Sequence, residues 1–387
     1  MILVVDMKNR QRILFVTNLY PSAEEPDRGV YIRNQAIALA KNGYDICILL
    51  MDYRSIRRKR KLGINWRRQD NIWVCHFSVP ISPFTSLQYA IAGELTKVGI
   101  SQIEKKLGKV NIIHGHFLEG AYGLLHIKNK FNVPIIFTEH GSNLLDQRRN
   151  KSENARMNNL YASVDEMIVV GHKQYECAEN FTIKSLSIIP NVIPSYFQYI
   201  PRADKDKSCF TFISVGNLIE SKCFDLLIET FEDLYKENKK IKLVVVGKGP
   251  LEGPLKRKVS ERNLSSVISF MGAVDNCKLV EIYNLADCFV LPSRFETFGV
   301  VYAEALCSGL PIISTRNGGI NDIYEEGCGH LVATDNKSEL KNAMRCIMLE
   351  KFDHQKLSDR FQYKFGEKAF LEKIGRVYDR ALKEQIK

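Results

Sequence analysis

Short apolar runs alternate with stretches of helical periodicity along almost the whole chain. The runs have the length and the Val/Ile content of strands, and most are followed by a loop and a candidate helix. This rhythm predicts parallel sheets covered by helices on both faces. In the first half the predicted strands are Arg12–Thr17, Tyr44–Met51, Val110–His116, Pro134–Thr138, Glu166–Val170 and Leu186–Ile189.

The rhythm breaks between Ser195 and Ser208, where polar residues predominate and no helical stripe is present. We therefore predict two doubly wound, Rossmann-like α/β domains over residues 1–195 and 208–369, joined by a linker over 196–207. An amphipathic helix over 370–387 is expected to pack back toward the N-terminal domain. The predicted strands of the second half are Phe210–Val215, Lys242–Val246, Val267–Phe270, Asp287–Leu291, Pro311–Ser314 and His330–Val332.

Two such domains place a cleft between the carboxyl ends of their strands, where open α/β sheets bind ligands. The chain of 387 residues is 45% hydrophobic and 26% charged, which excludes disordered and fibrous classes. No apolar run approaches the roughly 20 residues that span a bilayer. Met7 could serve as the start as well as Met1, so the first six residues are expected to be dispensable.

The net charge of +11 is concentrated in one segment. Between Arg54 and Arg68 lie eight Lys/Arg residues and no acid, so the remainder of the chain is nearly balanced. The ten cysteines form no CxxC pair and several lie in apolar runs, which favours reduced, buried thiols and a cytoplasmic location.

The strongest chemical signal runs from Arg294 to Pro311, directly after a predicted strand. Glu296 and Glu304 are separated by seven residues, with Gly299 at the point where a helix should begin. Backbone amides at a helix start can bind a phosphate. Carboxylates accept two hydroxyl hydrogens each, which suits sugar and ribose diols. An ordinary helix with a nearby acid is the alternative for this spacing taken alone.

This segment resembles the Glu-x7-Glu motif of the retaining GT-B glycosyltransferases of family four. Four further segments match the family's pattern in order, and the resemblance is strong in the second half and weak in the first. They are Gly216-Asn-Leu218 with Lys222 and Asp225, then Gly247-Lys-Gly249-Pro250, Phe270-Met-Gly272 and Gly318-Gly319.

The resemblance implies a GT-B fold and a nucleoside-diphosphate-sugar donor bound mainly by the second domain. It implies that Glu296 contacts the transferred sugar and Glu304 the ribose. Lys222 would neutralise the leaving diphosphate. The other donor-binding positions that it implies are Gly29, Gly216, Asn217, Met271, Phe298, Gly299 and Val300.

Two positions depart from the family pattern. Asn217 stands where an arginine commonly accompanies the lysine, and Cys223 replaces a glycine. Stabilisation of the leaving group is therefore expected to rest on Lys222 or on a cation from elsewhere.

Histidines follow two strands of the first half. The resemblance places His140 beside the donor sugar as a catalytic residue, and His116 with Glu119 is expected on the acceptor side. A lone histidine is otherwise more often structural, and that reading stays open for His116.

The sequence favours no metal site and no additional cofactor. Asp204 and Asp206 have the form of a metal-binding pair, but they lie in the linker and not after a strand. A Walker A sequence and a GxGxxG fingerprint are both absent.

The basic segment interleaves cations with apolar residues and admits three interpretations: a solvated loop, a nucleic-acid surface, or docking on an anionic membrane. No nucleic-acid-binding motif accompanies it, and lipid-linked acceptors lie at membranes, so we favour docking on the inner face of the cell membrane. The expected contacts are Arg57, Arg58, Lys59, Arg60 and Trp66.

Together these features predict a retaining glycosyltransferase that moves a sugar from a nucleoside-diphosphate-sugar to a lipid-linked saccharide of a bacterial surface polysaccharide. Two alternatives remain: a non-hydrolysing nucleotide-sugar epimerase of the same fold, and a non-catalytic saccharide- or membrane-binding module.

Overall fold

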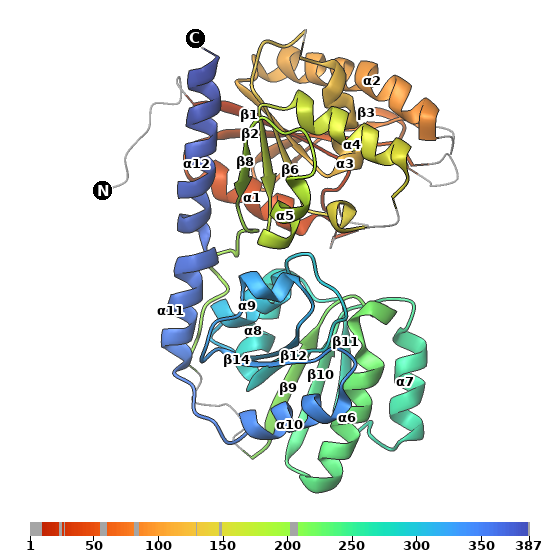
Figure 1. The fold of residues 1–387 in the computed structure, drawn as a ribbon, viewed down its shortest axis with the longest axis vertical. Coiled ribbons are helices and arrows are strands. Elements are labelled where there is room, and N and C mark those ends of the chain that lie inside the picture. The colour runs from red at the N-terminus through yellow and green to blue at the C-terminus, as the bar shows by residue number, and fades with distance from the viewer. Residues whose placement is uncertain are drawn as a thin grey trace. The chain divides into compact units, whose positions relative to one another are not determined.

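The computed structural model forms two compact units, unit 1 (1–192 and 370–387) and unit 2 (193–369) (Figure 1). The structure describes residues 10–22, 25–26, 28–54, 60–80, 85–128, 130–146, 149–201 and 208–385. Asp204, Asp206, Arg57, Arg58, Lys59, Met1 and Met7 lie outside these residues.

The described part of unit 1 is built on an eight-stranded sheet with the order β3-β4-β2-β1-β5-β6-β7-β8. Its strands are β1 Arg12–Thr17, β2 Asp45–Asp52, β3 Gly63–Gln69, β4 Ile72–Ser78, β5 Ile112–His116, β6 Ile135–Glu139, β7 Glu166–Val169 and β8 Leu186–Ile188. Its helices are α1 Val30–Lys41, α2 Thr85–Leu107, α3 Leu118–Ala121, α4 Lys151–Ser163, α5 His172–Ala178 and, from Phe370 onward, α12 Glu367–Glu384.

The alternation of side chains along β1 divides the core of unit 1 into two layers. Ile13 and Phe15 pack with α1 and α12, whereas Leu14 and Val16 pack with α2 and α4 on the other face. Both faces are buried, which explains the continuous apolar runs of these strands.

One edge of this sheet differs from the prediction of a wholly parallel sheet. β3 pairs antiparallel with β4, and neither strand was predicted. The basic residues Arg67 and Arg68 lie on β3, where charges on an edge strand discourage pairing with other chains.

Unit 2 contains a six-stranded, wholly parallel sheet with the order β11-β10-β9-β12-β13-β14. Its strands are β9 Phe210–Val215, β10 Ile241–Val246, β11 Ile268–Gly272, β12 Cys288–Leu291, β13 Ile312–Thr315 and β14 Gly329–Val332. Its helices are α6 Phe224–Glu237, α7 Glu252–Glu261, α8 Asn276–Leu285, α9 Val300–Cys307, α10 Lys337–Ile347 and α11 His354–Phe365. The two units are thus both parallel-sheet α/β domains, as predicted.

Candidate active site

In unit 2 the structure brings Lys222 and Glu296 together. Lys222 ends a short 3₁₀ turn after β9, and Glu296 lies in the loop between β12 and α9. Lys222 Nζ lies 2.5 Å from Glu296 Oε1, and Ser293 Oγ donates to the same oxygen at 2.9 Å. Both charged side chains are largely buried, at 18% and 10% exposure. Ser293 was not singled out in the sequence, although it lies two residues after the end of β12.

The Glu296 loop is fixed by the backbone of the Gly318-Gly319 segment. Gly319 N donates to Glu296 O at 3.1 Å, and Glu296 N donates to Asn317 O at 3.2 Å. A Cβ atom at Gly319 would lie 2.9 Å from both Glu296 O and Phe298 N. The glycine therefore permits an approach of two backbones that no side chain would allow.

α9 begins after Gly299, which has φ 87° and thus a left-handed conformation. Phe298 is buried against Phe365, so only its backbone is available to a ligand. Glu296 stays in the loop and Glu304 lies one turn inside α9, which confirms the predicted placement of both acids.

Glu304 is buried, and Tyr283 Oη donates to its Oε2 at 3.4 Å. Burial raises the pKa of Glu304 to about 8, with the Tyr283 hydrogen bond opposing the shift. Burial therefore favours the protonated form of this carboxyl group, which can both donate and accept a hydrogen bond.

The carboxyl ends of β9 and β10 are held close by glycines. A Cβ atom at Gly247 would come within 1.9 Å of Gly216 O, and one at Gly249 within 2.4 Å of Leu218 O. Asn217, on this loop, and Met271, in β11, are both exposed. The residues that the resemblance places at the donor thus include accessible ones after β9 and in β11, on either side of β10.

Cys223, which replaces the family's glycine, has φ 53°. Its thiol is buried and burial raises its pKa, so it is a packing residue and not a nucleophile. Arg294 lies beside this turn, because its backbone N–H donates to Ser221 O at 2.8 Å. Its guanidinium is bound to Asp335 at 2.8 Å and is half exposed, which makes it a nearby cation that the sequence did not indicate.

In unit 1 two glycines allow other backbone segments to pack closely against the loop that follows β1. Gly29 has φ 75°, and a Cβ there would lie 2.7 Å from Leu19 O. A Cβ at Gly120 would lie 2.5 Å from Asn18 N. Gly29 is therefore required for the start of α1 whatever ligand it meets.

His116 and His140 lie side by side in unit 1. His140 Nδ1 is 3.0 Å from Asn191 Oδ1, and His140 Nε2 is 3.0 Å from His116 Nδ1. An amide oxygen only accepts, so neutral His140 donates through Nδ1 and accepts through Nε2. His116 then donates through Nδ1, and its buried Nε2 is left without a partner among the described residues. Nothing in the sequence around Asn191 indicated this contact.

Burial keeps these imidazoles neutral. It lowers the pKa of His114 and His140 to about 3 and that of His116 well below its ordinary value. His114 is itself held by Tyr378 of α12 at 2.8 Å and by Thr138 at 2.7 Å. Both ring nitrogens of His140 are thus hydrogen-bonded within unit 1.

Unit 1 is expected to lose stability as the pH falls below about 6.5, the ordinary pKa of histidine. The unfolded chain binds protons on His114, His116 and His140 there, whereas the folded chain does not until a much lower pH. Urea unfolding monitored by tryptophan emission checks this, because both tryptophans, Trp66 and Trp73, lie in unit 1. The variant His140→Gln should show a shallower decline between pH 7 and 5, and an identical decline would contradict the assignment.

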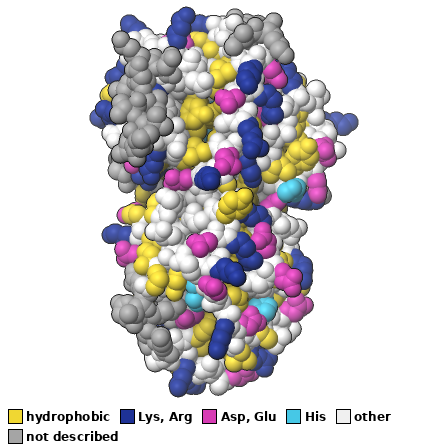
Figure 2. All heavy atoms as spheres, turned by 90° about the vertical axis from the view of Figure 1, so that its left-hand side faces the viewer, with side chains coloured by type: hydrophobic (Ala, Val, Ile, Leu, Met, Phe, Trp, Pro, Cys, Tyr) yellow, Lys and Arg dark blue, Asp and Glu magenta, His cyan; other side chains and the backbone are white. Residues whose placement is uncertain are grey.

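The basic segment is only partly described. Arg60 is 7% exposed and its Nε lies 3.0 Å from Asp52 Oδ2, so it is an internal ion-pair partner, and its predicted membrane contact is wrong for this side chain. Trp66 is half buried, packs edge-to-face on Trp73, and lies under Lys106. On the face drawn in Figure 2, Lys and Arg are intermixed with Asp and Glu across the described residues.

The described part of the chain lacks both a membrane-spanning helix and a metal-binding cluster. No helix in it is long and apolar enough to cross a membrane. It also contains no group of three or more His, Cys, Asp or Glu side chains that could hold a metal ion.

The two halves of the chain match two glycosyltransferase family models. Residues 197–365 match the glycosyl transferases group 1 model, and residues 29–195 match the glycosyltransferase family 4 model. An uncharacterized glycosyltransferase of Methanocaldococcus jannaschii is 27% identical over 290 residues, covering 73% of this chain and 76% of that protein.

A putative teichuronic acid biosynthesis glycosyltransferase of Bacillus subtilis, TuaC, is 24% identical over 366 residues, with 89% and 90% of the two chains covered. The structure of HepE from Anabaena in complex with UDP and glucose shares the fold, with a TM-score of 0.73 at 15% identity and 96% and 100% of the two chains covered. The two family models jointly span most of the sequence, and the chain belongs to the group 1 glycosyltransferases, which transfer a sugar from a nucleotide-sugar.

Proposed function

We propose that this glycosyltransferase retains the anomeric configuration of its nucleoside-diphosphate-sugar donor and transfers the sugar to a lipid-linked saccharide of a surface polysaccharide. The observation that carries the donor site is the contact between Lys222 and Glu296 at the carboxyl end of the unit 2 sheet. A likeness to HepE, solved with UDP and glucose, favours a uridine nucleotide.

In this proposal the ammonium group of Lys222 turns toward the diphosphate when the donor binds. Its contact with Glu296 then loosens, which frees the carboxylate to bind the sugar. A flexible ammonium suits a leaving group whose charge grows during the reaction. The amides that open α9, from Phe298 to Val300, are proposed to bind the same phosphates. Glu296 then accepts hydrogen bonds from hydroxyls of the transferred sugar.

Glu304 is proposed to bind the ribose. A protonated carboxyl group donates one hydrogen bond and accepts another, and both partners are present in a ribose diol. Gly29, Gly216, Asn217 and Met271 are proposed to line the remainder of the donor site. His140, anchored by Asn191, is proposed to lie beside the reacting face of the sugar.

Transfer is proposed to occur by attack of the acceptor hydroxyl on the face that the leaving diphosphate vacates. The new glycosidic bond forms as the sugar–phosphate bond breaks, and the diphosphate takes the acceptor proton. No protein nucleophile is assigned to this step. Binding of the transition-state charge by Lys222 and the α9 amides supplies the rate enhancement.

The test is a screen of UDP-, GDP- and ADP-sugars with saccharide acceptors, followed by NMR assignment of the product's anomeric carbon. The expected result is transfer from a UDP-sugar with retention, and loss of that transfer in Glu296→Gln and in Glu304→Leu, which removes both the donor and the acceptor of the carboxyl group. Inversion, or full activity of both variants, would overturn the proposal. A changed sugar in donor incubated without acceptor would instead indicate an epimerase.

The acceptor proposal draws on TuaC, named for teichuronic acid biosynthesis, and on the basic segment. We propose that Arg57, Arg58 and Lys59 dock on an anionic membrane, where each nearby cation contributes about 1 kcal/mol. The triple neutral variant should bind anionic vesicles at least tenfold more weakly than the parent chain. Unchanged sedimentation with the vesicles would remove the membrane from the proposal.

A further inference from the structure

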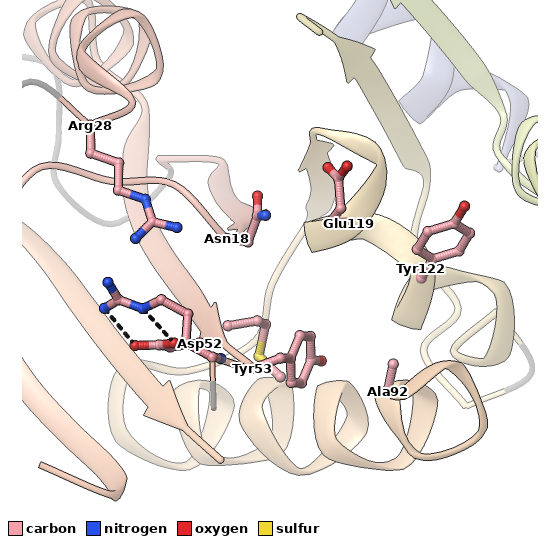
Figure 3. Close-up of a pocket in the computed structure, with 9 residues that line it drawn as sticks. Asn18, Arg28, Asp52, Tyr53, Ala92, Glu119 and Tyr122 are labelled. Atoms are coloured by element: carbon pink, nitrogen blue, oxygen red, sulfur yellow. Dashed lines mark hydrogen bonds and ion pairs between the residues drawn. The ribbon is translucent and has the colours of Figure 1, made fainter. Parts of the chain in front are cut away.

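Unit 1 contains a pocket of about 200 Å³ at the carboxyl ends of β1 and β2 (Figure 3). Open α/β sheets bind ligands at this end of their strands. Pockets that enclose drug-sized ligands measure about 300–1,000 Å³, so this one fits a single small group. It is lined by Asn18, Arg28, Met51, Asp52, Tyr53, Arg54, Ala92, Glu119 and Tyr122.

One wall of the pocket carries a rigidly held guanidinium. Arg54 Nε and Nη2 donate to the two oxygens of Asp52 at 3.0 and 2.9 Å, and the backbone N–H of Arg54 donates to Asp52 Oδ1 at 3.1 Å. Asp52 is only 5% exposed and also binds Arg60. Arg54 is therefore a cation whose orientation is fixed before any ligand arrives.

The guanidinium of Arg28 lies in the same pocket as that of Arg54. Arg28 Nη1 and Arg54 Nη1 both donate to Glu25 Oε2, at 3.1 and 2.8 Å. Glu25 is 45% exposed and offers one oxygen to both cations. Arg28 and Arg54 thus share the single half-exposed carboxylate of Glu25, whereas the buried carboxylate of Asp52 holds Arg54 and Arg60.

The opposite wall is chemically different. In Figure 3, Arg28 and Glu119 lie on either side of Asn18, and Glu119 is an exposed acceptor of hydroxyl hydrogens. Asn18 Oδ1 is buried and has no hydrogen-bond partner among the described residues. The pocket therefore offers donors to an anion on one side and acceptors to hydroxyls on the other.

We propose that this pocket binds an anionic group of the acceptor, a carboxylate or a phosphate, between Arg28 and Arg54, and that the anion replaces Glu25. Glu119 and Asn18 then accept hydrogen bonds from hydroxyls of the sugar or glycerol unit that carries the anion. The inference rests on the proposed function in one respect: it assigns the bound anion to the sugar acceptor. The anion site itself depends only on unit 1.

Calorimetry on the full chain tests the site with three small ligands: methyl β-glucuronide, methyl β-glucoside and sn-glycerol 3-phosphate. The charged ligands are expected to bind at least tenfold more tightly than the neutral glucoside. Arg28→Gln should weaken them about tenfold and leave the glucoside unchanged. Glu25→Gln should tighten them severalfold, because the internal competitor is gone.

Arg33→Gln is the matched control, because Arg33 is similarly exposed (34%) and binds Asp70 outside the pocket. It should bind every ligand as the parent chain does. A preference for the glucuronide points to an acidic sugar and a preference for the phosphate to a phosphorylated or lipid-phosphate acceptor, and both support the site. Equal binding of charged and neutral ligands, or equal losses in Arg28→Gln and Arg33→Gln, would overturn it. Titration with UDP separates the two proposals, because it reports the nucleotide site of the proposed function without using the unit 1 pocket.

Discussion

Replacing Lys222 with methionine is expected to lower kcat about 10²–10³-fold, the usual loss when one group that stabilises developing charge is removed. Methionine keeps most of the side-chain volume and removes only the charge. The KM for the donor should change less than kcat, because the ammonium matters most when the diphosphate leaves. Steady-state transfer from the nucleotide-sugar identified by the screen measures both constants.

The chain offers a matched control in the same unit. Lys258 contacts Glu229 at 2.5 Å, the same distance as Lys222 from Glu296, but at 24% and 34% exposure and on the helical layer. Lys258→Met should keep kcat within about twofold, since exposed pairs contribute little. Lys222→Arg restores the positive charge on a planar guanidinium in place of an ammonium group, and it should recover part of the rate. Equal rates in Lys222→Met and Lys258→Met would remove Lys222 from the mechanism.

The architecture of unit 2 could be predicted because its strands are buried on both faces. Such strands appear as unbroken apolar runs, and the acids of the Glu296 loop follow one of them directly. The edge of the unit 1 sheet, formed by β3, was harder to predict. Along β3, Ile64 and Trp66 alternate with polar residues, but the cations in and before this strand dominated the pattern and pointed to a loop.

The contacts that organise unit 1 were not predictable for a different reason. His140 meets Asn191 across 51 positions, and His114 meets Tyr378 across 264. Such pairings depend on the strand order β2-β1-β5-β6 and on the placement of α12, which a rhythm of strands and helices does not specify. The same holds for Arg28 and Arg54, which converge on Glu25 only once their loops are folded.

Asp52→Asn is expected to lower the free energy of unfolding of unit 1 by about 3–5 kcal/mol, the usual cost of leaving buried charges without their partner. Asp52 ends β2 and binds Arg54, Arg60 and His76 at 2.9–3.3 Å. Burial pushes the pKa of Asp52 upward, but the hydrogen bonds from His76 and Arg54 outweigh it and hold the pKa below its usual range. The stabilisation is therefore complete at neutral pH. It is lost as the pH falls from the pKa of Asp52 in the unfolded chain to its lower pKa in the folded chain.

Asp45 lies at the other end of the same strand and supplies the control. It binds Arg12 at 2.6 Å, but it is 40% exposed, so Asp45→Asn should cost no more than about 1 kcal/mol. Urea unfolding at pH 7, followed by the emission of Trp66 and Trp73, reports unit 1 for both variants. The difference between them should begin to shrink as the pH falls below about 4, the ordinary pKa of aspartate, because the unfolded parent chain then binds a proton at Asp52 that the folded chain does not. Equal losses in Asp52→Asn and Asp45→Asn at pH 7 would show that the buried carboxylate does not stabilise unit 1 through Arg54 and Arg60.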